Sequence, residues 1–367
     1  MRELLRANIA SLVPYRCARD EFTGTASVYL DANENWQDFV AEKGRNRYPD
    51  PLCVNLRHRI DEVMGLPFAH TVVGNGSDEI IDNLIRMFCV PGKDRILLMP
   101  PTYGAYRVFA DINDVKSDVV PLNENFGIDF PALEAYLAQE KRDRGNGRCK
   151  LLFICSPNNP TGNAFPVSNG VRLQGGVEAL EQIEQISSRF DGITVVDEAY
   201  FDFNRYPSAV TLLDRHPNLV VLRTLSKSWG LAGARVGILV ASEDICQVMR
   251  SMKYPYNVSS PAQETALHDL DHADAVREGT KEILAERERL NEVLPTIACV
   301  KQVYPTDANF FLVKVTDADG IYRYLMGKGI IVRNRTHEYH CQGCLRLTVG
   351  SKAENQALLA ALKEWKG

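Results

Sequence analysis

The segment Leu219–Arg235 places a lysine just beyond a strand that should be buried. It opens with four apolar residues, a pattern typical of a strand covered on both faces. Lys227 follows, and because burial lowers the pKa of an amine, this lysine could react with an aldehyde as a Schiff-base nucleophile. The hydroxyls of Thr224 and Ser226 and the guanidinium of Arg235 could hold a phosphate beside it. Taken alone, the pattern favours a lysine that only caps a strand–loop junction.

Other candidate groups follow strands elsewhere in the chain. Asp197 comes directly after the apolar run Ile193–Val196, a position that favours function for a charged side chain. A carboxylate there could keep a pyridine nitrogen protonated, so that the ring withdraws electrons from a substrate carbanion. Tyr103 could stack on such a ring, and Asn159 and Tyr200 could bond its phenolic oxygen. Tyr103 by itself is more simply an ordinary half-buried tyrosine.

The segment Gly74–Glu79 (GNGSDE) offers a second place for a phosphate. It lies between an apolar strand and a helix with one apolar face, so its residues should form the helix N-terminus. Free backbone N–H groups at such a terminus bind anions, and Ser77 and Asp78 are suitable capping residues. Because Ser–Asp caps are common, this segment alone does not identify a phosphate site.

Buried strands alternate with amphipathic helices from about residue 71, which predicts an α/β fold with a mostly parallel sheet and helices on both faces. Ligands of such sheets bind beyond the carboxyl ends of the strands, so the polar residues of five strands could share one crevice. The expected strands of this sheet are Thr71–Val73, Ile96–Met99, Leu151–Cys155, Ile193–Val196, Leu219–Leu222 and Val236–Val240.

The pattern changes after about residue 257 and predicts a smaller α+β domain. A long charged helix is expected over 262–294, strands at Phe310–Val315, Gly329–Val332 and Leu345–Val349, and helices near 319–327 and 352–365. We therefore predict three parts: an N-terminal arm over 1–30 that packs with the small domain, a large domain over 31–256 and a small domain over 257–367.

Composition excludes several classes of protein. The chain has 367 residues, 45% of them hydrophobic and 24% charged, which is typical of a globular protein of about two domains. A net charge of −5 without a basic stripe argues against a nucleic-acid partner. The first residues lack the features of a signal peptide, and no apolar run reaches the ~20 residues of a membrane helix. We therefore expect a cytoplasmic protein without a membrane partner.

The nine cysteines lack the spacing of a disulfide framework and are expected to be reduced thiols. The pair Cys341 and Cys344, with His337 and His340 just before it, could supply four zinc ligands. Structural zinc sites usually draw their ligands from two separated segments, so a turn that enters a strand is the better interpretation, and we predict no metal.

The motifs together resemble a known family. Ser156–Asn163 (SPNNPTGN), Asp197–Tyr200 (DEAY) and Ser226–Arg235 (SKSWGLAGAR) are similar in order and spacing to the aspartate-aminotransferase superfamily of pyridoxal-phosphate (PLP) enzymes, fold type I. Five further segments resemble the histidinol-phosphate aminotransferases within it. These are Leu30–Asn35 (LDANEN), Asn46–Pro51 (NRYPDP), Gly74–Glu79, Pro100–Tyr106 (PPTYGAY) and Gly343–Gly350 (GCLRLTVG).

The resemblance implies a seven-stranded, mostly parallel sheet between helices, a homodimer, and a role for each matching residue. Lys227 would form the Schiff base with PLP and move the proton, while Asp197 would pair with the ring nitrogen and Tyr103 would stack on the ring. The remaining expected cofactor contacts come from Asn159 and Tyr200 (ring oxygen), Ser77, Asp78, Thr224, Ser226 and Arg235 (phosphate), and Tyr48 (from the neighbouring subunit). The expected substrate contacts are Tyr15, Asn33, Asn159, Arg333 and Arg346.

The implied reaction is transamination between L-histidinol phosphate and 2-oxoglutarate in histidine biosynthesis. Two arginines suit this pair, because a guanidinium binds a carboxylate or a phosphate with two parallel hydrogen bonds. The alternatives are an aromatic-amino-acid transaminase or a threonine-phosphate decarboxylase of the same fold, and a PLP-binding regulator without turnover. Trp36 and a longer segment at Pro166–Gly176 depart from the family pattern and leave the shape of the substrate open.

Overall fold

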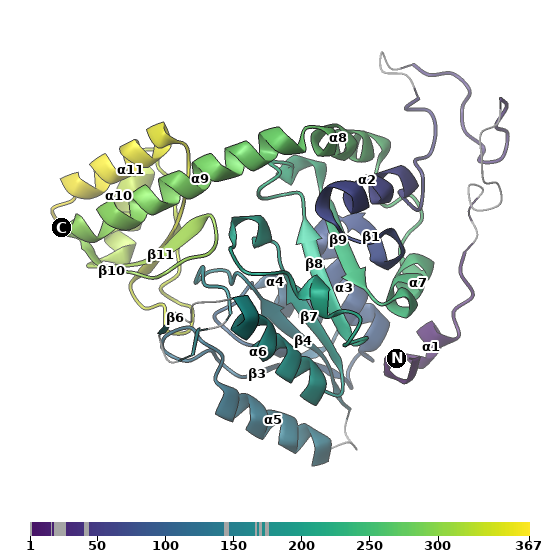
Figure 1. Ribbon diagram of the computed structural model, residues 1–367, viewed down its shortest axis with the longest axis horizontal. Helices are drawn as coiled ribbons and strands as arrows, with labels where there is room; N and C mark the ends of the chain where they lie inside the picture. Colours follow the sequence, from purple (N-terminus) through teal and green to yellow (C-terminus); the bar gives the residue numbers. More distant parts are fainter. Residues whose placement is uncertain are drawn as a thin grey trace.

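The computed structural model describes residues 2–15, 17, 27–39, 44–142, 147–165, 167–168, 171–172 and 176–367. A seven-stranded sheet lies at its centre, with the strand order β1-β9-β8-β7-β4-β2-β3 (Figure 1). Within this sheet β9 runs antiparallel to both neighbours and the other pairs are parallel, which confirms the predicted mostly parallel sheet. The strands are β1 (Thr71–Asn75), β2 (Arg95–Leu98), β3 (Lys116–Val119), β4 (Cys149–Cys155), β7 (Ile193–Asp197), β8 (Leu219–Thr224) and β9 (Val236–Ala241).

Helices cover both faces of the sheet because successive residues of its buried strands point to opposite sides. Val221 of β8 belongs to one apolar cluster and the adjacent Val220 to the other. The first face carries α2 (Val54–Met64), α5 (Phe130–Arg142), α6 (Gly176–Arg189) and α8 (Ser260–Asp271). The second face carries α3 (Gly76–Phe88), α4 (Ala105–Ile112) and α7 (Glu243–Met252).

A second, antiparallel sheet of four strands, in the order β10-β11-β13-β12, forms the expected smaller α+β unit. The long helix α9 connects it to the large sheet and runs along the upper edge of the molecule (Figure 1). The elements are β10 (Val300–Val303), β11 (Phe310–Val315), β12 (Arg333–Asn334), β13 (Cys344–Thr348), α9 (Ala273–Val293), α10 (Ala318–Gly327) and α11 (Lys352–Glu364). Short 3₁₀ helices are η1 (Arg2–Leu4), η3 (Phe68–His70), η4 (Phe201–Phe203), η5 (Ala209–Leu212), η6 (Ala232–Ala234) and η7 (Leu294–Thr296).

Three elements differ from the sequence prediction. The helix expected over 262–294 is two helices, α8 and α9, because His272 between them has φ −107° and ψ 30°. Strands β3 and β10 were not predicted, since both are sheet edges in which no residue is fully buried and about half or more of the residues are polar. The strand expected at Gly329–Val332 starts only at Arg333.

The start of the predicted arm lies on the large domain. Leu4 is buried in the apolar cluster of the second face, and its carbonyl accepts a hydrogen bond from Lys150 Nζ at 2.9 Å. The helix α1 (Ala7–Ala10) follows directly. The apolar side chains of these residues pack beside α3 and α7, and the predicted contact of the rest of the arm with the small domain stays a prediction. The domain boundaries themselves remain a prediction.

The segment predicted as an insertion, Pro166–Gly176, contains a short antiparallel pair, β5 (Val167–Ser168) with β6 (Val171–Arg172). Residues 166, 169–170 and 173–175 lie outside the described residues. Among the residues that the structure describes, no helix is long and apolar enough to cross a membrane.

The close approach of β9 to the start of α3 generates a stability prediction. A Cβ atom on Gly237 would lie 2.3 Å from the backbone of Gly76 and Ser77, where nothing can move aside cheaply. Gly237→Ala should lower the free energy of unfolding by about 1 to 3 kcal/mol. In contrast, Gly279→Ala in α9 meets nothing within 4 Å and should raise it by about 0.5 to 1 kcal/mol. Urea unfolding followed by circular dichroism measures both, and equal midpoints for the two variants would contradict the packing argument.

Candidate active site

A cavity of about 410 Å³ opens at the carboxyl ends of the parallel strands, where the sequence predicted a crevice. It lies between the large sheet and the β12–β13 edge of the small sheet. Most of the predicted site residues line it, which brings together segments more than 260 positions apart in the chain. These residues are Ser77, Asp78, Tyr103, Asn159, Asp197, Tyr200, Thr224, Ser226, Lys227, Arg235, Arg333 and Arg346.

Asp197 ends β7 and supplies a buried carboxylate at the cavity floor, with only 3% of its surface exposed. Its Oδ2 accepts a hydrogen bond from the Tyr106 hydroxyl at 2.6 Å, and its Oδ1 accepts one from the Ala199 N–H at 3.1 Å. Burial raises the pKa of this carboxyl, while the two donors oppose that rise. The remaining acceptor capacity of Asp197 faces the cavity and suits a cationic N–H group.

Lys227 follows β8 and lines the cavity together with Arg346. Its Nζ lies 5.4 Å from the centre of the Tyr200 ring. Partial burial and the positive charge of Arg346 lower the pKa of this amine, while the carboxylates of Asp197 and Asp78 oppose the shift. A lysine in this setting is more readily neutral than a surface lysine, as a nucleophile or a proton acceptor must be.

The start of α3 and the loop after β8 form a cup for an anion. The N-cap residue Asn75 makes no side-chain hydrogen bond to the helix, so backbone N–H groups of the first turn remain available to a ligand. Arg235 pairs with Asp78 at 3.2 Å and packs directly on Gly76, where a Cβ atom would lie 2.5 Å from the guanidinium. Thr224 and Ser226 complete the cup, with 3.0 Å between their hydroxyl oxygens.

Two tyrosines shape the wall beside Asp197. Tyr103 lies edge-on to Tyr106, with ring centres 5.4 Å apart, and donates its hydroxyl to Asp78 at 3.1 Å. Tyr106 is fully buried and stacks on Phe153 with 4.7 Å between ring centres. The packing of Tyr106 therefore fixes the direction of its hydrogen bond to Asp197.

The small domain contributes cations to the opposite wall. Arg346 of β13 donates to Asn159 Oδ1 at 2.5 Å, and its guanidinium carbon lies 5.3 Å from the centre of the Phe310 ring. Arg333 of β12 is directly opposite Arg346 in the strand pairing. Tyr200 packs edge-on to Phe310, and burial raises its pKa. The site is thus assembled from both sheets.

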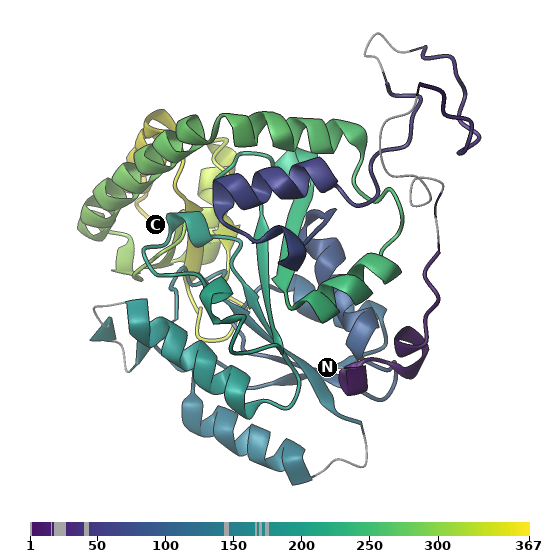
Figure 2. The same ribbon diagram turned by 45° about the vertical axis from the view of Figure 1, so that its right-hand side comes forward.

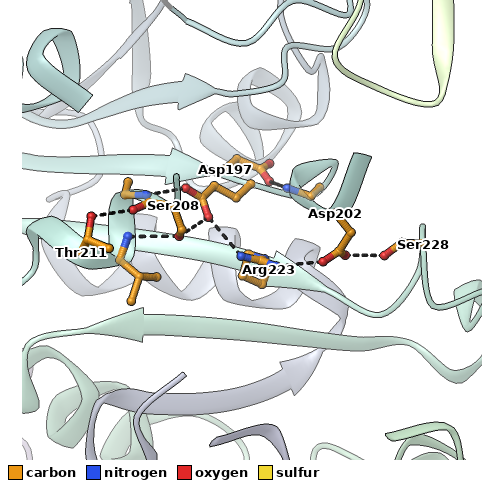
Figure 3. Close-up of polar contacts among 10 residues, drawn as sticks. Asp197, Asp202, Ser208, Thr211, Arg223 and Ser228 are labelled. Atoms are coloured by element: carbon orange, nitrogen blue, oxygen red, sulfur yellow. Dashed lines mark hydrogen bonds and ion pairs between the residues drawn. The ribbon is translucent and has the colours of Figure 1, made fainter. Parts of the chain in front are cut away.

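A buried network of charges holds the segment that carries Lys227 (Figure 3). Arg223 of β8 bonds Glu198 at 3.3 Å and Asp202 at 3.1 Å, and its guanidinium lies 3.9 Å from the centre of the Phe201 ring. Asp202 in turn accepts the hydroxyl of Ser228, the residue after the lysine. The network therefore links the end of β7 to the lysine loop through side chains.

Three predicted site residues do not reach the cavity. Tyr15, Asn33 and Tyr48 are exposed, and Tyr48 stacks on Tyr256 instead, with 4.5 Å between ring centres. Glu34 connects two of the predicted motifs, because its carboxylate accepts the Tyr48 N–H at 2.7 Å. The described part of the chain between α1 and α2 includes a segment that extends away from the body of the molecule (Figure 2).

Sequence reasoning missed three features of the site. Tyr106 was within a quoted motif but had no assigned role, and Arg335 looked like any polar residue of a turn. The partners of Arg223 were also missed, although a charged residue in an otherwise apolar strand was a signal that could have identified them.

The cysteine pair is not among the residues that line the cavity. Cys341 and Cys344 are fully buried, and burial raises the pKa of both thiols. Within the described residues, no three His, Cys, Asp or Glu side chains are grouped so that they could hold a metal ion.

Comparisons with known proteins agree with the predicted family. The model of the family "Aminotransferase class I and II" matches residues 21–362. A histidinol-phosphate aminotransferase of Parabacteroides distasonis is 45% identical, over 100% of this chain and 99% of the relative. The crystal structure of the histidinol-phosphate aminotransferase from Clostridium acetobutylicum shares the fold, with a TM-score of 0.75 and 23% identity over 87% of this chain and 90% of that chain. The enzyme from Sinorhizobium meliloti, in complex with pyridoxal-5'-phosphate, gives a TM-score of 0.73 and 23% identity over 87% and 83% of the two chains.

The hydrogen bond from Tyr106 to Asp197 generates the prediction for this site. Tyr106→Phe keeps the ring stack but removes a donor to a buried carboxylate, so the pKa of Asp197 should rise further. Because the ionised carboxylate is the form that binds a cationic ring nitrogen, affinity for pyridoxal phosphate should fall about tenfold, as expected for a hydrogen bond to a charged group. The acid limb of binding should move to higher pH for the same reason.

Tyr136→Phe is the matched control, since Tyr136 also donates to a carboxylate, Asp118, at 2.7 Å but does not line the cavity. Spectrophotometric titration of the apoprotein across pH measures both variants. Equal affinities and equal acid limbs in the two would show that Tyr106 does not act through Asp197.

Proposed function

Because the chain belongs to the class I and II aminotransferases, we propose that it transfers an amino group between L-histidinol phosphate and 2-oxoglutarate. The products are imidazole-acetol phosphate and glutamate, and the reaction belongs to histidine biosynthesis. The observation that carries the proposal is that Lys227, Asp197 and the arginines Arg333 and Arg346 line one cavity. The relative from P. distasonis, which carries this activity in its name and matches along the whole chain, supports the substrate pair.

The cofactor of this family is pyridoxal 5′-phosphate, and the residues of the cavity fit it. A buried carboxylate, a lysine with a lowered pKa and an anion cup at a helix N-terminus are the groups that its ring nitrogen, aldehyde and phosphate require. When bound, the cofactor supplies the aldehyde that takes up the amino group and the ring that withdraws electrons from the substrate carbon.

The residues that would face the cofactor then have distinct roles. Asp197 holds the proton on the ring nitrogen, and Arg235, Thr224, Ser226 and the first N–H groups of α3 hold the phosphate. Lys227 Nζ accepts a proton from the substrate carbon that bears the amino group and later returns it, in keeping with the lowered pKa of this amine.

The substrate is oriented from the opposite wall, which keeps its reacting carbon near Lys227. Arg346 binds the oxyanion with a guanidinium that is already held in place by Asn159 and covered by Phe310. Tyr103, which is half-buried, and Tyr200, which is buried, flank the ring and its oxygen and limit the access of water to that side of the cavity.

A homodimer completes the proposal. Exposed aromatic and aliphatic side chains crowd the segment that extends from the body, and such a surface is normally covered by a partner. These residues are Val28, Leu30, Trp36, Phe39 and Tyr48, together with Tyr254. Tyr48 then reaches the cofactor of the partner, and Tyr15 and Asn33 reach the substrate in the assembled dimer.

The reaction is tested by an absorption spectrum of the purified holoenzyme. Histidinol phosphate should bleach the visible band of the lysine-bound cofactor, and 2-oxoglutarate should restore it. Lys227→Ala should bind the cofactor without that band and lose turnover by more than about a hundredfold. Lys281→Ala, an exposed lysine of α9, should keep both.

A band that responds to glutamate but not to histidinol phosphate would keep the aminotransferase and reject the substrate. Release of carbon dioxide from threonine phosphate in place of glutamate formation would identify the decarboxylase instead. Substantial turnover by Lys227→Ala would refute the role of the lysine.

The dimer is tested by subunit mixing. Lys227→Ala and Tyr48→Ala each damage the site, but a heterodimer of the two has one site with both residues intact. Random pairing makes half of the dimers mixed, so refolding an equimolar mixture should restore about a quarter of wild-type activity. A mixture no more active than its components would show that Tyr48 does not act across subunits.

A further inference from the structure

A third arginine of the small sheet region, Arg335, lines the cavity beside the expected Arg333 and Arg346. Arg333 pairs directly with Arg346 across β12 and β13, and the Arg335 N–H donates to Cys344 O at 2.9 Å, which continues the ladder. Residues two apart on a strand point to the same face, so Arg333 and Arg335 present their side chains on the side that carries Arg346. The small sheet therefore offers three guanidinium groups to one cavity.

Three like charges on one face of a sheet repel one another unless an anion joins them. The acids among the lining residues are Asp78 and Asp197, and both are engaged at the cofactor end, by Arg235 and by Tyr106 respectively. Burial lowers the pKa of Arg346, and the positive charges of Arg335 and Arg333 lower it further. An anionic ligand would remove this repulsion.

Arg335 is only partly neutralised by its own surroundings. Its Nη1 lies 3.4 Å from Glu338 Oε1, a long contact to a carboxylate that is itself about one third exposed. Its Nε is buried and has no hydrogen-bond partner among the described residues. The guanidinium thus keeps donors that are not used within the protein.

We propose that Arg335 binds the phosphate of the phosphorylated substrate together with Arg333 and Arg346, and so determines which substrates this site prefers. The inference rests on the proposed function and adds a residue to it. A phosphate monoester offers three terminal oxygens and close to two negative charges, whereas a carboxylate offers two oxygens and one charge. Two arginines satisfy the carboxylate of glutamate, and the third guanidinium finds a partner only on the phosphate.

The test compares phosphorylated with non-phosphorylated ligands in the holoenzyme. Arg335→Gln should raise KM for histidinol phosphate about tenfold to a hundredfold, while KM for glutamate should change by less than about threefold. Arg335→Lys keeps the charge but loses the planar guanidinium, so its KM for histidinol phosphate should lie between those of the wild type and Arg335→Gln. Arg323→Gln, an exposed arginine of α10 that does not line the cavity, should match the wild type.

Inorganic phosphate gives a readout that does not depend on the substrate assignment. It should inhibit the glutamate half-reaction of the wild type competitively, and Arg335→Gln should weaken this inhibition about tenfold. If the wild type rejects histidinol phosphate yet shows this difference, the proposed function fails and the role of Arg335 stands. The inference would be overturned if Arg335→Gln weakened the binding of glutamate and of phosphate equally, or weakened neither. Unchanged thermal unfolding of Arg335→Gln excludes a folding defect as the cause.

Discussion

Burial of charge where β7 and β8 end is the constraint on which the rest of the structure depends. Asp197, Glu198 and Arg223 are each at most 5% exposed. A buried charge without partners costs several kcal/mol, so these side chains are tolerated only because each is bonded. Glu198 alone accepts from the Ser208 hydroxyl, the Ala209 N–H and Arg223.

This constraint fixes the register of β7 against β8 and, through it, the positions of Asp197 and Lys227. Thr194 to Asp197 pair with Leu219 to Leu222, and only this register places Arg223 beside Glu198. A slip by one residue would turn Arg223 to the opposite face and leave Glu198 unpaired. The Asp197 carboxylate at the end of β7 and the loop that carries Lys227 are therefore positioned by the same strand pairing, and the bonds of Arg223 extend to Asp202 and, through it, to Ser228 (Figure 3).

Sequence patterns predicted the part of the site that depends on strand ends and short motifs. Lys227, Asp197 and Arg235 each follow or precede an apolar strand, and parallel strands bring such ends to one edge of a sheet. Arg335 could not be identified in this way, because its position depends on the pairing of β12 with β13 rather than on a local pattern. Tyr106 was likewise hidden, since its hydrogen bond joins residues 91 positions apart.

Other misses have different physical causes. The break between α8 and α9 depends on the backbone of a single residue, His272, within a continuous charged pattern. Strands β3 and β10 carry polar residues because they are sheet edges, so their hydrophobic signal is weak. Tyr48 was expected at the cofactor of a neighbouring subunit, which stays a prediction, and within this chain it stacks on Tyr256.

The reversed direction of β9 has a consequence for how the chain folds. Because β9 runs antiparallel to β8, the two strands form a hairpin, and no crossover helix separates Lys227 from Arg235. Lys227 and Arg235 are thus brought together by a short loop, and closing a short loop costs little chain entropy. The contacts of Asp197 with Tyr106 and of Asn159 with Arg346 close loops of 91 and 187 positions. A nascent chain can therefore form the β8–β9 hairpin from local contacts. The contacts of Asp197 and of Arg346 form only once most of the sheet topology is in place.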